Sequence, residues 1–300
     1  MARQDADWAV QQYEAVRRLL PKAEMPKKSS YATGLEEIAD HIDVFLLDAF
    51  GVLNVGGSAI NGAARCVRSL RAMGKRVLVL TNGARVPAEQ ALAKFESLGF
   101  DFSLSEIVSS RDAMTAHLRG WQIGGYWGAM SAGNSQMEAV GVPWRRLEDD
   151  PQVYVEASGF LLVSAAEWNS TQQELLRESL VEKPRPVLVG NPDIVAPREY
   201  GLSLEPGYFA YALIRELGLD AGLFGKPFAN IFDLAFSRIG EVDKKRVAMV
   251  GDTLHTDVLG GAAYGLQTVL VTGHGLFAGQ DYADFIARTK IAPDYIIPSI

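Results

Sequence analysis

Polar residues that could do chemistry follow three separate apolar runs of the chain. Asp48 follows the first of these runs, Thr81 the second and Asp252 the third, while Lys226 stands in a Gly-Lys-Pro loop. Two carboxylates, a hydroxyl and an ammonium together suit a hard cation and a phosphate group. This chemistry requires that the four side chains, although distant in the sequence, meet in space.

The pattern around these residues predicts a fold that brings them together. Short apolar runs alternate with helical spacing, which is typical of parallel βαβ construction. The predicted strands are 44–47, 76–80, 107–108, 247–250 and 268–271, and the predicted helices are 63–73, 87–99, 113–118, 208–217 and 257–264. In an open parallel sheet, ligands bind beyond the carboxyl ends of the strands. We therefore expect a doubly wound parallel α/β sheet with the polar residues at one edge.

A stretch with a different pattern interrupts this fold. Strands are expected at 124–127, 159–163 and 187–189, with a helix at 174–180. The expected organisation is an N-terminal helical extension (1–29), a core domain (30–112 and 206–300) and a smaller α/β cap domain (113–205). In the extension, an apolar stripe that includes Trp8 and Tyr13 should pack on the main body or on a partner subunit.

Composition and charge narrow the class of protein. The net charge of −7, without a Lys/Arg-rich stripe, argues against nucleic-acid binding. No apolar run approaches the ~20 residues that span a membrane, and the first residues lack the pattern of a signal peptide. The single cysteine, Cys66, cannot form a disulfide framework. A cytoplasmic location is expected.

Four segments carry a resemblance to a known family. Residues 48–53 (Asp-Ala-Phe-Gly-Val-Leu), 81–82 (Thr-Asn), 225–227 (Gly-Lys-Pro) and 251–257 (Gly-Asp-Thr-Leu-His-Thr-Asp) resemble the ordered motifs of the haloacid dehalogenase superfamily. The insertion, which contains Gly-Asn-Pro-Asp at 190–193, resembles that of the class IIA branch. That branch includes p-nitrophenyl phosphatases and phosphatases of sugar phosphates and pyridoxal phosphate.

The resemblance implies a nucleophile and a metal site. Asp48 would attack phosphorus and form an aspartyl-phosphate. Mg²⁺ would be held by Asp48, by the backbone carbonyl of Phe50 and by Asp252, with Asp257 at or beside the metal. The substrate would be a small phosphorylated metabolite. Because relatives often dimerise through the cap, a homodimer is a further expectation.

The resemblance also implies residues that bind the phosphate. The hydroxyl of Thr81 and the backbone N–H of Asn82 would donate to it, and Lys226 would neutralise its charge. Asn191 and Asp193 begin a loop that faces the site from the cap in relatives.

Ordinary structural roles compete with these functions. An Asp or Thr after a strand can be only a helix cap or turn residue, and Asn191 to Asp193 can form a plain turn. For His255, inside the last motif, we expect a solvated loop position and not metal binding.

Phe50 departs from the usual motif of the phosphatases. Most of them have a second Asp there, which protonates the leaving oxygen and then activates water. Phe50 cannot carry a proton, and such transfer contributes ~100- to 10,000-fold in rate. The substrate could have a good leaving group, as acyl and aryl phosphates do, or Asp193 could supply the proton.

Two other functions remain open for a chain with this departure. It could be a weak or inactive protein that binds a phosphorylated metabolite. It could also be a dehalogenase-like hydrolase, because 2-haloacid dehalogenases have an aromatic residue at this position and halide leaves without an acid. The insertion and the motif at 251–257 fit a magnesium and phosphate site better, so we rank the phosphatase first.

Overall fold

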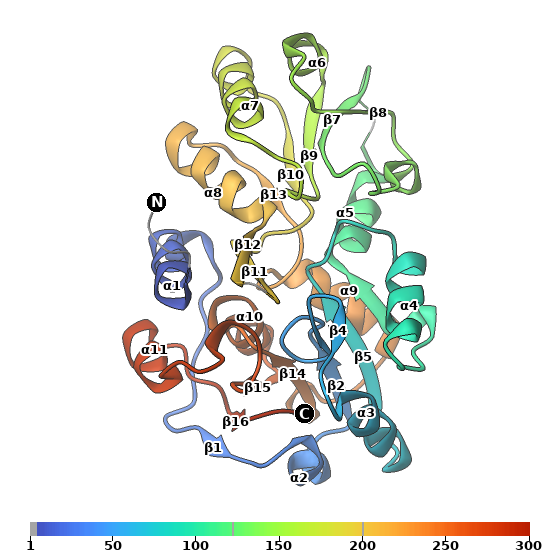
Figure 1. Ribbon diagram of the computed structural model, residues 1–300, viewed down its shortest axis with the longest axis vertical. Coiled ribbons are helices and arrows are strands. Elements are labelled where there is room, and N and C mark those ends of the chain that lie inside the picture. The colour runs from blue at the N-terminus through green and yellow to red at the C-terminus, as the bar shows by residue number, and fades with distance from the viewer. Residues whose placement is uncertain (1–4, 122, 200) are drawn as a thin grey trace.

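A seven-stranded sheet forms the larger part of the computed structural model, which describes residues 5–121, 123–199 and 201–300 (Figure 1). The strand order is β1-β16-β15-β14-β2-β5-β6, and every adjacent pair is parallel. The strands are β1 (Ser30–Tyr31), β2 (Val44–Leu47), β5 (Arg76–Thr81), β6 (Ile107–Ser109), β14 (Val247–Gly251), β15 (Gln267–Val271) and β16 (Tyr295–Ile297). The predicted central strands are therefore confirmed to within a residue or two.

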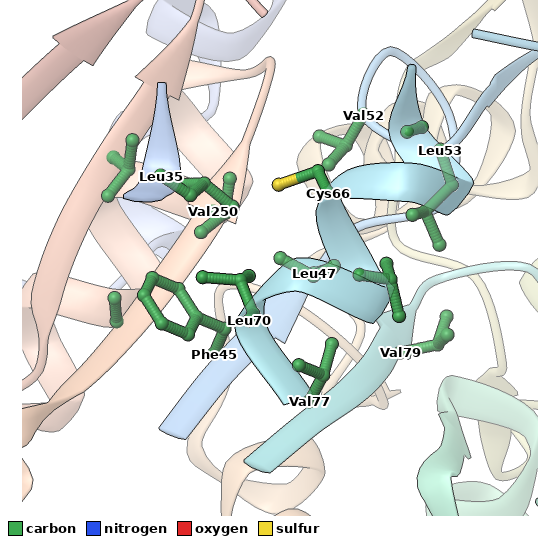
Figure 2. Packing of buried hydrophobic residues seen from close by; sticks show 14 of the residues in the cluster. Leu35, Phe45, Leu47, Val52, Leu53, Cys66, Leu70, Val77, Val79 and Val250 are labelled. Carbon is green, nitrogen blue, oxygen red and sulfur yellow. The ribbon is translucent and has the colours of Figure 1, made fainter. Parts of the chain in front are cut away.

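Helices cover both faces of this sheet. They are α2 (Leu35–Ile38), α3 (Ala63–Ala72), α4 (Ala88–Ser97), α5 (Ser110–Leu118), α9 (Ala229–Ile239), α10 (Leu259–Tyr264) and α11 (Tyr282–Thr289). Alternate residues of β2 point to opposite sides. Phe45 packs with Leu70 of α3 on one face (Figure 2), and Leu46 packs with Phe232 of α9 on the other. This is the doubly wound α/β fold that the sequence predicts.

A second, five-stranded parallel sheet stands above the first in Figure 1, in the order β13-β10-β9-β7-β8. Its strands are β7 (Trp127–Met130), β8 (Trp144–Arg146), β9 (Gly159–Leu162), β10 (Val187–Val189) and β13 (Gly222–Leu223), with helices α6 (Pro151–Glu156), α7 (Ser170–Glu182) and α8 (Pro206–Leu217). The strand expected at 124–127 begins only at Trp127, because Gly125 (φ +106°) lies in a bend before it.

The position of α8 differs from the prediction. The sequence assigns this helix to the first sheet, but its buried residues Ala210 and Leu213 pack with Leu176 of α7 and Val189 of β10. The strand that follows, β13, pairs with β10. Apolar spacing predicts a helix but does not indicate which sheet it covers. We accordingly propose that the cap continues to about residue 223.

Shorter elements complete the fold. They are the hairpins β3 (Asn54–Val55) with β4 (Ser58–Ala59) and β11 (Val195–Arg198) with β12 (Gly201–Leu204), and the turns η1 (Arg17–Leu19), η2 (Ala39–His41), η3 (Leu104–Glu106), η4 (Met137–Val140), η5 (Lys244–Arg246), η6 (Leu254–Val258) and η7 (Gly275–Phe277). The hairpin β11–β12 lies between the two sheets (Figure 1). Among the described residues, no helix has the length and apolarity to cross a membrane.

The N-terminal helix α1 (Ala6–Ala15) is capped by the side chain of Asp5, which accepts a hydrogen bond from Trp8 N. Its buried stripe includes Val10 and Tyr13 and packs with residues of η6, α10 and α11. The expectation that this stripe packs on the main body is therefore confirmed.

Candidate active site

The carboxyl ends of three adjacent strands carry the residues that the sequence singled out. Asp252 follows β14, Asp48 follows β2 and Thr81 ends β5, and these strands are neighbours in the order β14-β2-β5. Carboxylate oxygens of Asp48, Asp252 and Asp257 all lie within 4.8 Å of one another. The convergence expected from the parallel topology is present in the structure.

Lys226 joins this cluster from the loop between β13 and α9. Its Nζ is 2.6 Å from Asp48 Oδ1 and 2.7 Å from Asp257 Oδ1, and the residue is only 1% exposed. Although burial disfavours the ammonium, Asp257 and Asp48 raise the pKa of Lys226 above its ordinary value. Lys226 is therefore a permanent positive charge beside the candidate nucleophile.

Asp252 is fixed by main chain that approaches it closely. Its Oδ2 accepts a hydrogen bond from Leu276 N (2.8 Å), and its Oδ1 accepts one from the Thr253 hydroxyl (3.0 Å). A Cβ atom would lie 2.5 Å from Asp252 Oδ2 at Gly51 and 1.9 Å from it at Gly275, and both glycines have positive φ. Only glycine allows this approach.

Asp257 lies on η6, a π-helical turn, where its Oδ2 accepts from Thr253 N (3.0 Å). The sequence predicts a regular helix from Asp257, but α10 begins only at Leu259. Such turns occur at functional sites, and apolar spacing does not reveal them. The expected solvated position of His255 is wrong, because it is completely buried in the same turn.

The charge of the cluster fits a divalent cation. Three carboxylates face one ammonium, so the ionised cluster carries excess negative charge. Burial raises the pKa of Asp48 and of Asp252 above the ordinary range, and Asp257 acts in the same direction. A hard cation held by carboxylate oxygens would offset this repulsion, as Mg²⁺ does in proteins.

Asn82 has a larger role than the backbone donor expected from the sequence. Its Nδ2 donates to Lys226 O (2.8 Å), and its Oδ1 accepts from Lys226 N (2.7 Å). The same Nδ2 is 2.7 Å from Asp193 Oδ1 on the cap side. Thr81, whose oxygen accepts from Gly83 N (3.1 Å), lines the cavity beside it.

The cap side of the site begins at Asn191. Its Oδ1 accepts from Asp193 N (3.0 Å), which closes the expected Asn-Pro-Asp turn, while its Nδ2 donates to Glu205 Oε2 (3.2 Å). Burial raises the pKa of Asp193 well above its ordinary value, although Lys226 opposes the shift. The segment is therefore a turn and also lines the site.

Two cations flank Phe50, the aromatic residue two positions after Asp48. Lys94 Nζ is 4.7 Å and the Arg198 guanidinium carbon 4.8 Å from the centroid of its ring. Arg198 also pairs with Glu205 (2.8 Å). Sequence reasoning missed Lys94, Arg198 and Glu205, because none of them stands in a motif or at the end of a predicted strand.

A cavity of about 790 Å³ contains these groups. Its walls come from the first sheet, where Asp48 and Phe50 lie, and from the cap, where Asp193 and Arg198 lie. It is larger than one phosphate group needs, so a phosphorylated molecule with a further organic part could enter it.

Comparison with protein families gives two matches in this chain. Residues 45–137 match a family described as haloacid dehalogenase-like hydrolase, and residues 223–300 match one described as HAD-hydrolase-like. These two ranges include Asp48, Thr81, Lys226 and Asp252.

Individual proteins are similar over almost the whole chain. A glycerol-3-phosphate phosphatase of Gallus gallus is 30% identical over 292 residues, which cover 87% of this chain and 90% of that protein. The crystal structure of a possible sugar phosphatase from Cytophaga hutchinsonii has a TM-score of 0.79 and 26% identity, covering 92% of this chain and 98% of its own. A glycerol phosphate phosphatase of Mycobacterium tuberculosis, solved in complex with magnesium, has a TM-score of 0.68 and 23% identity, with 86% and 75% covered. The chain belongs to the haloacid dehalogenase-like hydrolases.

Proposed function

We propose that this protein is a magnesium-dependent phosphatase that removes phosphate from a small metabolite through an aspartyl-phosphate on Asp48. The observation that carries the proposal is the Asp48 carboxylate, which pairs with Lys226 and lies beside Asp252 and Asp257 at the cavity. The glycerol-phosphate phosphatases and the possible sugar phosphatase among its relatives support a polyol or sugar phosphate as substrate.

In the first step, an oxygen of Asp48 attacks phosphorus, and the bond between phosphorus and the leaving oxygen breaks. Asn82 holds the main chain of Lys226, and Asp257 pairs with its ammonium. This ammonium stabilises the negative charge that develops on the phosphoryl group. The Thr81 hydroxyl donates to a phosphoryl oxygen. Asp48, Asp252 and the Phe50 carbonyl would hold Mg²⁺, with Asp257 beside them. When bound, Mg²⁺ would further neutralise the charge of the phosphate.

Proton transfer is assigned to Asp193 in this proposal. Its carboxyl group lines the cavity, is oriented by Asn82, and has a raised pKa that favours the protonated form. Asp193 gives its proton to the leaving oxygen. In the second step, water attacks the aspartyl-phosphate, the bond between phosphorus and Asp48 breaks, and the Asp193 carboxylate takes the proton of that water.

A screen of phosphate esters with MgCl₂ tests the function. The unmodified protein should turn over at least one ester continuously, and Asp48→Asn or added EDTA should abolish turnover. An unchanged Tm for Asp48→Asn would show that the fold is retained. Turnover by Asp48→Asn at the unmodified rate would contradict the assigned nucleophile.

A second variant tests the role of Asp193. With p-nitrophenyl phosphate, whose leaving group needs little acid, Asp193→Asn should release about one equivalent of p-nitrophenolate rapidly and then stall, because the water is no longer activated. Asp193→Asn that keeps the steady-state rate of the unmodified protein would exclude it as the acid and base.

The two alternative functions predict other outcomes of the same screen. A binding protein without turnover would give neither burst nor steady-state product but would retain the ligand. A dehalogenase-like hydrolase would release chloride from a 2-chloroacid without magnesium. The phosphatases among its relatives favour the phosphatase over both alternatives.

A further inference from the structure

The N-terminal helix α1 contacts both halves of the candidate site, although the sequence assigned it no chemistry. Its Tyr13 is 1% exposed and makes two specific contacts at once. Its ring stacks on His255 with the centroids 4.9 Å apart and the planes 7° from parallel. Its hydroxyl oxygen accepts a hydrogen bond from Ile194 N at 3.0 Å. One side chain therefore bridges the core and the cap.

On the core side, α1 supports the π-helical turn that carries Asp257. His255 lies inside this turn, is completely buried, and has its Nε2 2.7 Å from Glu14 Oε1 of α1. A π-helical turn is an irregular conformation, and such conformations persist where the surrounding packing holds them. Tyr13 and Glu14 provide that packing from outside the cavity.

On the cap side, Tyr13 accepts its hydrogen bond from Ile194 N, and Ile194 directly follows Asp193. The Asp193 side chain is held by Asn82, and the main chain that follows it is held by Tyr13. Burial raises the pKa of Tyr13 well above its ordinary value. The hydroxyl group therefore stays protonated near this carboxyl group.

We propose that Tyr13 is a positioning residue that fixes the carboxyl group of Asp193 relative to the turn carrying Asp257. This inference rests on the proposed function, in which Asp193 transfers the proton. Tyr13 itself touches neither the substrate nor the reacting atoms. Proton transfer and attack require reacting groups within hydrogen-bonding reach, so a small shift of the cap loop would reduce the rate.

The variant Tyr13→Phe separates the two contacts, because phenylalanine can stack on His255 but offers no acceptor to Ile194 N. kcat/KM is measured with glycerol 3-phosphate, a poor leaving group, and with p-nitrophenyl phosphate, a good one. Loss of one buried hydrogen bond corresponds to roughly fivefold. We expect kcat/KM to fall about fivefold more for the alkyl ester than for the aryl ester, in the same direction as the larger difference expected for Asp193→Asn.

Val10→Ala provides the matched control. Val10 is a buried apolar residue of the same helix, so its truncation removes packing from α1 without removing a side-chain hydrogen bond. This variant should lower Tm and leave the ratio of the two kcat/KM values unchanged. If Tyr13→Phe also leaves that ratio unchanged, the hydroxyl has no positioning role.

A second measurement is independent of turnover. Glu14 is partly exposed, so Glu14→Ala should fold while leaving His255 Nε2 without its partner. We expect Glu14→Ala to show a smaller rise of Tm on addition of MgCl₂ than the unmodified protein and Val10→Ala, whereas Tyr13→Phe, which keeps the stacking on His255, should show the full rise. A full rise in Glu14→Ala, together with an unchanged ester ratio in Tyr13→Phe, would overturn the inference. Absence of turnover in the unmodified protein would instead contradict the proposed function, while the Tm measurement would still test α1.

Discussion

At Phe50, the side chain determines which proton transfers are available near the nucleophile. A carboxyl group at this position would lie two residues after Asp48, where the sequence resemblance leads us to expect an acid. Here the aromatic ring is contacted by Lys94 and Arg198, so the surroundings favour negative charge and would keep a carboxyl group ionised. A carboxyl group introduced at position 50 would therefore be a better base than acid.

The variant Phe50→Asp tests this effect of the two cations. It should raise kcat for glycerol 3-phosphate by only about tenfold, which is below the ~100-fold lower end of what general acid–base catalysis contributes, because the two cations keep the carboxyl group ionised. The gain should increase when Lys94→Met removes one cation. Phe50→Leu, which changes the ring but adds no carboxyl group, is the control. An equal gain in Phe50→Leu would show that relief of crowding, and not proton transfer, causes the effect.

The elements of the site differ in how well the sequence predicts them. The strands β2, β5 and β14 are largely apolar runs, as expected for strands buried on both faces, and parallel strands end at the same edge of a sheet. The residues at their ends, Asp48 and Asp252, were therefore predictable as neighbours.

Other parts of the site lack such a local signal. The hairpin β11–β12 contains Pro197, which weakens a strand pattern, and the π-helical turn keeps ordinary helical composition. Tyr13 contacts Ile194, and only the folded chain brings such distant positions together. Sequence motifs identify groups that face the substrate, whereas the residues that position them depend on tertiary packing.

The short turn η7 offers a test of how main chain holds Asp252. Gly275 and Gly279 have similar φ angles, +73° and +70°. A Cβ atom at Gly275 would lie 1.9 Å from Asp252 Oδ2, whereas one at Gly279 meets nothing within 4 Å. Both Gly275→Ala and Gly279→Ala should lower the free energy of unfolding by about 1–2 kcal/mol through backbone strain.

Only Gly275→Ala should also displace the carboxylate. We expect it to lose most phosphatase activity and the rise of Tm caused by MgCl₂, while Gly279→Ala keeps both at a temperature where it is folded. Calorimetry with and without MgCl₂ measures both effects. Similar magnesium responses in the two variants would mean that Asp252 tolerates the displacement or does not bind the metal.

For the whole molecule, the arrangement of the two sheets makes the cavity a space shared between core and cap. Asp48 and Lys226 lie on the core side, while Asp193, Arg198 and Glu205 reach it from the cap. A shared cavity allows the cap to exclude water when it is closed and to release product when it opens. The homodimer and the cytoplasmic location expected from the sequence stay predictions.

Glu199, in the turn between β11 and β12, connects cap and core at the rim of this cavity. Its Oε1 accepts from Gly57 N (2.6 Å), and a Cβ atom at Gly56 would lie 2.0 Å from the same oxygen. The variant Glu199→Ala should therefore favour an open cap. Because the side chain is exposed, we expect a Tm close to that of the unmodified protein, with KM raised about three- to tenfold and kcat not reduced.

The contact between Glu199 and Gly57 depends on pH, because the Glu199 carboxyl group is ionisable. The Gly57 N–H lowers the pKa of the Glu199 carboxyl group, so the contact is fully present above the ordinary glutamate pKa of about 4.3 and weakens as the pH falls below it. The KM difference between Glu199→Ala and the unmodified protein should accordingly be constant from about pH 6 to 8.

Gly56→Ala, whose Cβ would displace the carboxylate, should raise KM as Glu199→Ala does. Gly74 also has a positive φ, but a Cβ atom there would meet nothing within 4 Å, so Gly74→Ala should leave KM unchanged. A raised KM in Gly74→Ala would mean that general backbone strain, and not the displaced carboxylate, causes the effect.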